Sequence, residues 1–311
     1  MAEDRGNVVL TAKDLTLSFG THEILKETNL TVHQQDRIGI MGRNGSGKST
    51  LLKILAGVDA PSKGDVYKQK NLRIGYLPQN FELDHSKTVL ENVLDGAAYT
   101  CKLLEEYENL DPSSSRAADL IDEITHLDGW DLEQQAEYFM ESLGTPPADK
   151  NVALLSGGEQ RRVALCKTLI SNPDFLILDE PTNHLDTESI EWLEGCLKKF
   201  RGGILLVTHD RYFLDRVTNR IFELSHGDII SYQGNYSQYL IKKAELEETA
   251  GLVEHKRQRQ LKKELAWVRA GVKARTTKSK SRLNRYYEEA GKKSFEKDPN
   301  VDLIIPKAPQ L

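Results

Sequence analysis

The N-terminal part of the chain alternates apolar and polar positions in short runs. This alternation, over 8–20 and again over 25–42, predicts β-strands that are separated by polar turns. The run RIGIM ends at Gly42, and the apolar spacing in STLLKILAG then predicts a helix that stops at Gly57. The chain therefore passes from a strand through a glycine-rich loop into a helix.

The middle of the chain changes to a helical pattern and then returns to alternating strands and helices. From about Thr88 to Lys150 the spacing is helical and the composition acidic, and DPSSS at 111–115 interrupts it. We therefore expect a helical subdomain with a short two-helix hairpin. The pattern then predicts a helix over 157–170, a buried strand over 175–179, a helix near 187–200 and a strand in GILLVTHD. Short apolar strands that alternate with helices are typical of a largely parallel sheet covered by helices.

The last part of the chain, from Tyr239 to Lys293, is charged and helix-prone. An apolar residue recurs at intervals of four, three and four positions and forms one narrow stripe on a basic helix, at Leu261, Leu265, Val268 and Val272. Residues 276–281 are typical of a turn, and a second stripe follows at Leu283, Tyr286 and Tyr287. The pattern predicts a basic helical hairpin over about 241–300.

Composition favours a cytoplasmic protein that is neither exported nor inserted into a membrane. Of the 311 residues, 29% are charged and 7% are aromatic. No stretch approaches the ~18–20 apolar residues that a membrane-spanning helix needs, and MAEDRGNVVL is too polar for a signal peptide. The 3 cysteines are odd in number and lack metal-ligand spacing, so we expect reduced thiols.

The charge is concentrated unevenly along the chain. Twelve Lys or Arg residues and one acid, Glu264, lie between Lys256 and Arg285, a net charge of +11 in a chain whose total is −5. The rest of the chain must then carry −16. An acidic body with one basic segment indicates a localised anionic partner.

The glycine-rich loop fits the P-loop pattern. Its residues are Gly42, Arg43, Asn44, Gly45, Ser46, Gly47, Lys48 and Ser49, with Thr50 next in the following helix. In this motif the backbone N–H groups and the helix N-terminus surround phosphate oxygens. Lys48 would neutralise the β- and γ-phosphates, and Ser49 would be a ligand of Mg²⁺. A glycine-rich turn with an incidental lysine is the alternative, and the preceding strand and following helix argue against it.

An apolar strand over 175–179 ends in two consecutive acids, Asp179 and Glu180. Carboxylates in such a place are costly without a counter-charge, so the pair indicates a bound cation or a catalytic role. Asp179 is suited to Mg²⁺ through water, as in other P-loop enzymes. Glu180 is suited to act as the general base that polarises the attacking water.

The segment LSGGEQ, residues 155–160, places two glycines behind a serine at the start of a helix. This is a second anion-binding helix N-terminus, and one nucleotide does not need two of them in one subunit. The segment resembles the signature of the ABC ATPase family, which implies a head-to-tail dimer with ATP between the P-loop of one domain and the signature of the other. Ser156 and Gly158 would then contact the γ-phosphate across the interface. A glycine-rich helix cap is the alternative.

Further positions of the ABC ATPase pattern follow along the chain. Phe19 resembles the aromatic residue that stacks on adenine, with a core residue at a strand end as the alternative. Gln79 in YLPQN resembles the Q-loop glutamine that senses Mg²⁺ and the γ-phosphate. Asp186 in TNHLD resembles the aspartate at the dimer seam, where a helix N-cap is the alternative. His209 resembles the switch histidine that holds the γ-phosphate and the attacking water, and together with Lys48 and Glu180 it would form the catalytic set.

The resemblance covers about residues 7–240 and implies an α/β fold. The expected architecture is a P-loop ABC-type nucleotide-binding domain over 1–240, with a helical subdomain and short arm at about 88–150, followed by a basic α-helical linker over 241–311. LSGGEQRRVAL, DEPTNHLD and HGDIISYQGNYSQYL resemble the ABC-F group, and ELAWVRAGVKAR resembles its Uup-like branch. The 76 residues between Gln79 and Ser156 leave room for a short arm only, which agrees with that branch.

Membership of the ABC-F group would imply the partners. ABC-F proteins carry two ATPase domains joined by this linker and bind the tRNA exit site of the ribosome, with the linker tip directed at the P-site tRNA. We therefore expect ATP and Mg²⁺ as cofactors, and a second ABC ATPase domain, the ribosome, rRNA and tRNA as partners. The sequence ends at Leu311, where a second domain would begin, so we expect a fragment of a longer chain.

Two other functions stay open at this point. The ATPase subunit of an ABC membrane transporter shares every ATPase motif and would carry the basic hairpin as a coiled-coil appendage. A DNA-repair ATPase would share the affinity for nucleic acid, although nothing in the sequence resembles a zinc hook or a very long coiled coil.

Overall fold

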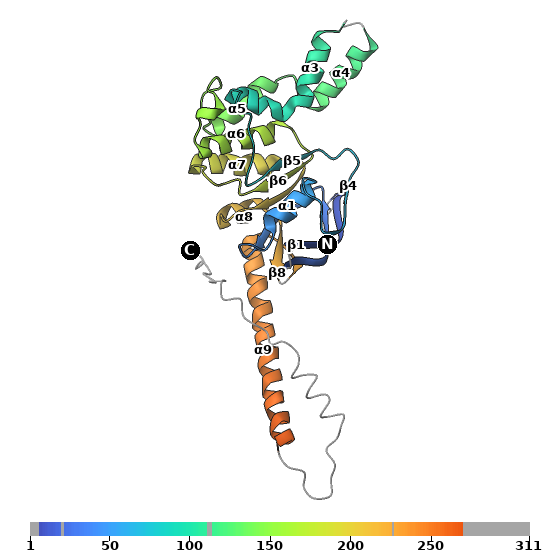
Figure 1. Cartoon of the computed structure of the whole chain (residues 1–311), viewed down its shortest axis with the longest axis vertical. Coiled ribbons are helices and arrows are strands. Elements are labelled where there is room, and N and C mark those ends of the chain that lie inside the picture. The colour runs from blue at the N-terminus through green and yellow to red at the C-terminus, as the bar shows by residue number, and fades with distance from the viewer. Residues whose placement is uncertain (1–5, 20–21, 111–113, 226, 270–311) are drawn as a thin grey trace, which may run out of the picture. The chain divides into compact units, whose positions relative to one another are not determined.

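The computed structural model describes residues 6–19, 22–110, 114–225 and 227–269 (Figure 1). The chain divides into two compact units, 1–236 and 237–311. The division falls where the last described helix, α9 (Tyr236–Arg269), begins. Each unit is described by itself.

A six-stranded sheet forms the centre of the first unit. Its strands lie in the order β5 (Ile74–Leu77), β6 (Phe175–Asp179), β7 (Gly203–Val207), β3 (Arg37–Gly42), β8 (Arg220–Ser225) and β9 (Asp228–Gln233). All neighbours from β5 to β8 pair in parallel, and β9 pairs antiparallel with β8. Every residue of β6 and β7 is buried, because helices cover both faces of the sheet. The predicted largely parallel sheet is confirmed.

The first strands of the chain belong to a separate antiparallel sheet. It has the order β2 (His22–His33), β1 (Val8–Phe19) and β4 (Lys63–Lys68). Its buried residues, among them Leu15, Leu25 and Val32, pack into one core with residues of β3 and α1 (Lys48–Ala56). The sequence predicted these strands but not the second sheet, because pairing between distant strands leaves no local pattern.

Two edge strands were missed by the sequence pattern. Most positions of β4 and β9 are exposed, with two half-buried positions in β4 and one half-buried and one buried position, Tyr232, in β9, and each strand lies at the edge of its sheet. A strand that faces solvent on most sides carries few apolar residues, so its hydrophobic signal is weak. The two remaining strands that were not predicted, β5 and β8, are short.

The predicted helices of the α/β part are confirmed. α1 ends at Gly57, which has φ 85° and donates its N–H to the carbonyl of Ile54, so the expected helix stop is a left-handed cap. The predicted helices over 157–170 and near 187–200 are α6 (Gly157–Ile170) and α7 (Thr187–Lys199), and a further helix, α8 (Arg211–Val217), was not predicted.

The helical subdomain between β5 and β6 also agrees with the pattern. It contains α2 (Val89–Leu94), η1 (Asp95–Ala97), α3 (Ala98–Glu108), α4 (Ser115–His126), α5 (Leu132–Ser142) and η2 (Val152–Leu154). α3 and α4 lie side by side in Figure 1 and share a small core of Leu103, Leu120 and Ile124. They are the expected short hairpin.

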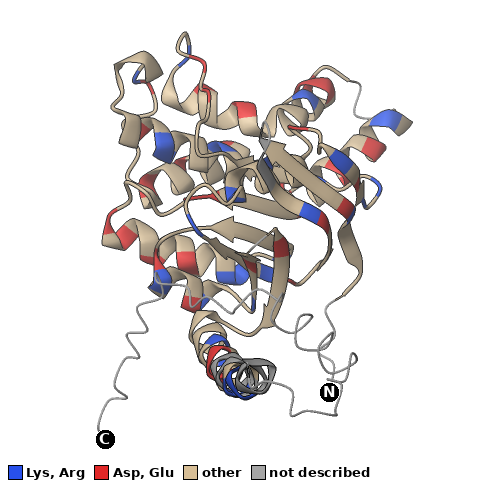
Figure 2. Ribbon diagram, turned by 60° about the horizontal axis from the view of Figure 1, so that its bottom comes forward, with Lys and Arg blue, Asp and Glu red and all other residues tan. Residues whose placement is uncertain are grey.

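In the second unit the structure describes one helix, α9. Glu245, Glu247 and Glu248 lie in its first half and the basic residues from Lys256 onward in its second, whereas both signs of charge are scattered over the helices of the first unit (Figure 2). The expected turn and returning helix fall outside the described residues, as do the side chains of Leu265 and Val268. None of the helices in the described ranges combines the length and the apolar content that crossing a bilayer requires.

Candidate functional site

The glycine-rich loop joins β3 to α1 and is shaped by its glycines. Gly45 and Gly47 have φ of 79° and 85°, which side chains with a Cβ rarely adopt. A Cβ on Gly47 would lie 2.5 Å from Cγ2 of Ile24 in β2. Gly47 is also the N-cap of α1, so the loop delivers its backbone N–H groups to the positive end of the helix.

Lys48 begins α1 and bends back over the loop. Its Nζ donates to the carbonyls of Gly42, at 2.9 Å, and Arg43, at 3.0 Å. Burial lowers the pKa of Lys48, and the carboxylates of Glu180 and Asp179 partly offset that effect. The side-chain oxygen of Ser46 is buried and has no hydrogen-bond partner among the described residues. The ammonium of Lys48 and the unpartnered hydroxyl of Ser46 could both donate hydrogen bonds to an anion that is bound at the loop.

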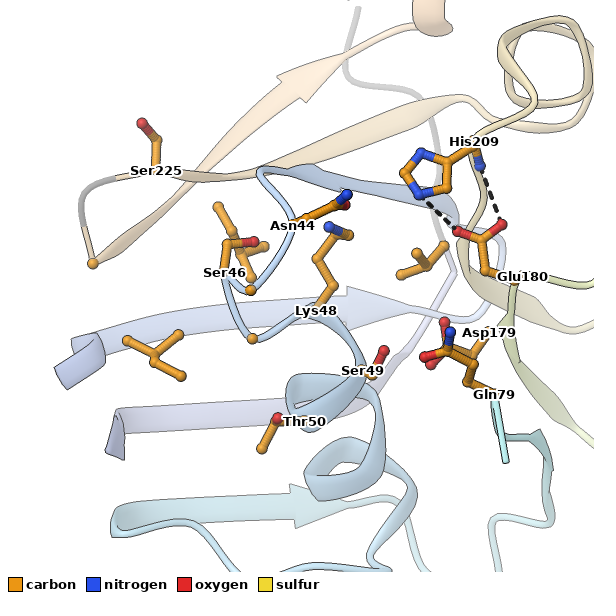
Figure 3. Close-up of a pocket in the computed structure, with 16 residues that line it drawn as sticks. Asn44, Ser46, Lys48, Ser49, Thr50, Gln79, Asp179, Glu180, His209 and Ser225 are labelled. Carbon is orange, nitrogen blue, oxygen red and sulfur yellow. Dashed lines mark hydrogen bonds and ion pairs between the residues drawn. The ribbon is translucent and has the colours of Figure 1, made fainter. Parts of the chain in front are cut away.

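A pocket of about 910 Å³ opens over this loop (Figure 3). The lining residues that the sequence predicted come from the loop, the start of α1, or the ends of neighbouring strands and the segments that directly follow them. The sequence-predicted residues that line it are Asn44, Gly45, Ser46, Gly47, Lys48, Ser49, Thr50, Gln79, Asp179, Glu180 and His209. Parallel strands meet at one edge of the sheet by their carboxyl ends, and this explains why residues 130 positions apart, Ser49 and Asp179, share one pocket.

Asp179 ends β6 and is 1% exposed. Burial raises the pKa of its carboxyl, and a hydrogen bond from Ser49 works in the opposite direction. Its Oδ2 atom is buried and has no hydrogen-bond partner in the described part of the chain. Gln79 lies on the same side of the pocket (Figure 3). A hydroxyl, a carboxylate with an orphan oxygen and an amide are hard oxygen donors, the set that Mg²⁺ prefers.

Glu180 follows directly and faces His209. Its φ is 55°, an uncommon conformation for a residue with a side chain and one that is found at functional sites. Its Oε2 accepts the backbone N–H of His209 at 3.2 Å, and its Oε1 lies 3.5 Å from Nε2 of the same residue. Burial raises the pKa of Glu180, His209 lowers it, and Asp179 raises it. The carboxyl therefore holds its proton to a higher pH than an ordinary glutamate does.

The remaining predicted residues lie outside this pocket. Ser156 is the N-cap of α6 and forms a capping box with Glu159, whose N–H it accepts at 3.3 Å. Asp186 is the N-cap of α7 and accepts the N–H of Ser189 at 2.8 Å. Gly158 lies in the first turn of α6, and Gly42 reaches the site through its carbonyl, which binds Lys48. Phe19 ends β1, and its side chain is outside the described part of the structure.

Sequence reasoning missed an apolar part of the lining. Ile24, Val207 and Leu224 come from β2, β7 and β8, Ser225 ends β8, and Gly227 lies in the turn that follows. Val207 lies in GILLVTHD and Gly227 in HGDIISYQGNYSQYL, but neither stretch indicated that these residues line the pocket. Their position follows only from the packing of two sheets. Ile24, Val207 and Leu224 add apolar surface to a lining that otherwise consists mostly of polar groups.

A prediction of stability follows from the burial of Asp179. Because its folded pKa lies above the ordinary value, its ionisation destabilises the folded chain as the pH rises through that pKa. Asp179→Asn should therefore stabilise the ligand-free protein at neutral pH by on the order of 1 kcal/mol, about 2–4 °C in melting temperature. Asp122→Asn, an exposed change on α4, should leave the melting temperature within about 1 °C. A lower melting temperature for Asp179→Asn than for the wild type would contradict this account of the site.

Comparisons with known proteins agree with the geometry. A family model described as ABC transporter matches residues 25–183, and a second model with the same description matches residues 222–300. A dimeric bacterial ABC transporter cassette of known structure superposes with a TM-score of 0.55 at 28% identity, over 72% of this chain and 98% of that chain. A dimeric post-hydrolysis state of an ATP-binding cassette bound to ADP and Pi superposes with a TM-score of 0.54 at 27% identity.

Curated relatives match almost the whole chain. The energy-dependent translational throttle protein EttA of Mycobacterium tuberculosis is 44% identical over 97% of this chain and 56% of its own length. EttA of Escherichia coli K12 is 40% identical over 93% of this chain and 54% of its own length. The ABC transporter ATP-binding protein YfmR of Bacillus subtilis is 44% identical over 89% of this chain. The chain thus spans about half the length of these relatives. The names of these three relatives do not show whether the chain belongs to the Uup-like branch, so that assignment stays a prediction. By both family models and these relatives, the chain belongs to the ABC ATPase family, in its ABC-F group.

Proposed function

We propose that the chain is the ATP-binding and ATP-hydrolysing half of a cytoplasmic ABC-F protein that acts on the ribosome. One observation carries the enzymatic part: the P-loop, the carboxylates of Asp179 and Glu180, and His209 converge on one pocket of about 910 Å³. That pocket combines a phosphate cradle, oxygen donors for a cation and a base. We assign the ATPase domain to residues 1–240 and the basic helical linker to 241–311.

The loop would bind the phosphates of ATP. Backbone N–H groups at the start of α1 and the ammonium of Lys48 would neutralise the β- and γ-phosphates. Lys48 would exchange the carbonyls of Gly42 and Arg43 for phosphate oxygens, which are the stronger acceptors. Asn44, Ser46 and Thr50 would line the phosphate chain, and Phe19 would stack on adenine.

The oxygen donors around Asp179 fit Mg²⁺. Ser49 and Gln79 would bind the ion directly and Asp179 through water, and its buried Oδ2, which lacks a partner among the described residues, would gain one. When bound, Mg²⁺ supplies positive charge against the phosphate oxygens during transfer.

Glu180 would act as the general base in hydrolysis. It takes a proton from the attacking water, whose oxygen forms a bond to the γ-phosphorus while the bond to the β-phosphate oxygen breaks, giving ADP and phosphate. A base must be unprotonated at the working pH yet basic enough to accept a proton, and the raised pKa of Glu180 serves the second need. His209, which contacts Glu180, would hold the γ-phosphate and the attacking water.

The site would be completed by a second ABC ATPase domain. Ser156, Gly158 and Asp186 lie outside the pocket of their own domain, so they are free to serve the pocket of a partner domain in a head-to-tail pair. The structural relatives of this cassette include dimers.

A mixing experiment tests the shared site. The chain carries one P-loop and one signature segment, so its ATPase activity per molecule should rise with protein concentration as pairs form. Lys48→Ala and Ser156→Arg should each be inactive alone. Their mixture should recover part of the activity, because a mixed pair retains one intact site. Activity per molecule that does not depend on concentration, or a mixture that stays inactive, would count against shared sites.

The proposed partner is the ribosome, with its rRNA and tRNA. The relatives called energy-dependent translational throttle protein support this choice over a transporter subunit. Cosedimentation of Glu180→Gln with ribosomes in the presence of ATP tests it. Cosedimentation with membrane vesicles instead would favour the transporter function, and a signal that nuclease abolishes without ribosomes would favour another nucleic acid.

The basic linker should make the ribosome affinity depend on salt. Phosphate contacts release counterions, with a log–log slope of about −0.7 to −0.9 for each contact. The five residues that we expect at the tip are Lys273, Arg275, Lys278, Lys280 and Arg282, all outside the described ranges. Replacing them with Ser or Gln should flatten the slope by about 3.5 to 4.5 units if each makes one phosphate contact, and should leave ATP binding intact. If the salt dependence of ribosome affinity did not change, the linker would serve only as a spacer and would not contact RNA through these five residues.

A further inference from the structure

A buried arginine of α6 connects three parts of the site. Arg161 is the fifth residue of that helix and is 6% exposed. Its Nη1 donates to the carbonyl of Gln79 at 3.0 Å. Its Nη2 donates to the carbonyls of Asp179 and Glu180, the latter at 2.9 Å. The guanidinium thus binds the backbone of three of the residues that line the cation and base side of the pocket.

The chemistry of these contacts requires a planar, forked cation. One guanidinium donates hydrogen bonds to three carbonyl oxygens that lie on two separate segments. The ammonium of a lysine could not make the same set of bonds, because it lacks the rigid, forked arrangement of N–H groups. The ring of Phe81 lies 5.8 Å from the guanidinium carbon and covers it. Burial lowers the pKa of Arg161, while the charges of Asp179 and Glu180 raise it, so the two carboxylates favour its charged form.

Two features show what this arrangement must hold in place. Glu180 has φ 55°, a conformation that the surroundings must stabilise, and its carbonyl is one of the atoms that Arg161 binds. Asp179 has a buried orphan oxygen, so its backbone must be fixed if that oxygen is to meet a cation in the right place.

We propose that Arg161 is a positioning residue that holds Gln79, Asp179 and Glu180 in register with one another and with the start of α6, the helix that Ser156 caps. The inference rests on the proposed function. Ser156 lies about one turn before Arg161 on α6. A movement of the α6 N-terminus, where a partner's nucleotide would bind, is therefore transmitted to the carboxylates of the other nucleotide site through one side chain. Arg161 itself lines no part of the 910 Å³ pocket.

The test compares Arg161→Met and Arg161→Lys with Arg37→Met. Arg37 is a matched control, because its guanidinium also donates to three backbone carbonyls, those of Leu197, Lys198 and Phe200. It lies at the opposite end of β3 from the glycine-rich loop. Three quantities are measured for each protein: the Kd for ATP without Mg²⁺, the Mg²⁺ concentration that gives half of the full increase in ATP affinity, and the single-turnover hydrolysis rate.

Both Arg161 variants should keep the Mg²⁺-free Kd within about threefold of the wild type, since the phosphate cradle is untouched. The Mg²⁺ requirement should rise and the hydrolysis rate should fall, each by about 10- to 100-fold, as for other residues that orient metal ligands. Arg37→Met should change none of the three by more than about threefold.

Several results would overturn the inference. Wild-type values in Arg161→Lys would mean that charge alone suffices, and a weakened Mg²⁺-free Kd in both Arg161 variants would mean that the residue only stabilises the fold. If Arg37→Met lost Mg²⁺ response and hydrolysis rate to the same extent as the Arg161 variants, Arg161 would likewise be a residue that only stabilises the fold. A wild-type chain that binds no ATP under any condition would overturn the proposed function, and this inference with it.

Discussion

Glu180→Gln is expected to bind ATP as the wild type does and to hydrolyse it about 10²- to 10⁴-fold more slowly, the range for loss of a general base. The amide has nearly the shape of the carboxylate but does not accept a proton from water. It can still accept the N–H of His209, now at 3.2 Å from Oε2, so the strained backbone at residue 180 keeps this contact. The defect should therefore be confined to the chemical step.

The measurement is single-turnover hydrolysis of radiolabelled ATP, with the Kd for ATP measured in parallel. Glu133→Gln, an exposed change on α5, is the control and should keep the wild-type rate within about twofold. ATP-bound protein should accumulate in the Glu180 variant. Equal turnover in Glu180→Gln and the wild type would remove Glu180 from the mechanism.

Lys48→Ala is expected to weaken nucleotide binding itself. Loss of a hydrogen bond between charged groups costs about 1.5–3 kcal/mol, which corresponds to a Kd for ATP raised roughly 10- to 150-fold. A second effect acts in the same direction, because Lys48 also binds the carbonyls of Gly42 and Arg43 and so helps to shape the ligand-free loop.

Titration with a fluorescent ATP analogue measures this change. Lys53→Ala is the matched control, since Lys53 is an exposed lysine of the same helix and should keep the Kd within about twofold. ADP affinity should fall as well, because Lys48 would face the β-phosphate in the proposed site. If Lys48→Ala and Lys53→Ala bind ATP equally well, the pocket does not hold phosphate in the proposed way.

The motifs could be located from the sequence because each one depends on neighbours a few residues away. The loop from Gly42 to Ser49 needs glycines at positions of positive φ and a helix directly after them, and both requirements are visible in the sequence. The stop of α1 at Gly57, the buried strand that ends at Asp179 and the capped start of α6 are equally local. Sequence alone therefore located the segments that the structure brings to the pocket and to which we assign the chemistry.

Local sequence does not distinguish a residue that caps a helix from one that contacts a partner's nucleotide. Ser156 and Asp186 fit both a helix cap and a nucleotide contact, and the structure shows that each one caps its own helix. The cap does not exclude a contact to a partner's nucleotide, since a helix N-terminus keeps further N–H groups free. That choice depends on a second domain and not on any spacing within the motif.

Only the tertiary structure decided which distant segments meet. The apolar part of the lining comes from Ile24, Val207 and Leu224, and the fork of Arg161 reaches across 82 positions to Gln79. The division of the strands into two sheets and the orphan oxygen of Asp179 are decided in the same way. These contacts result from many small packing and pairing energies summed over the whole fold, and no one of them is large enough to leave a pattern in the sequence.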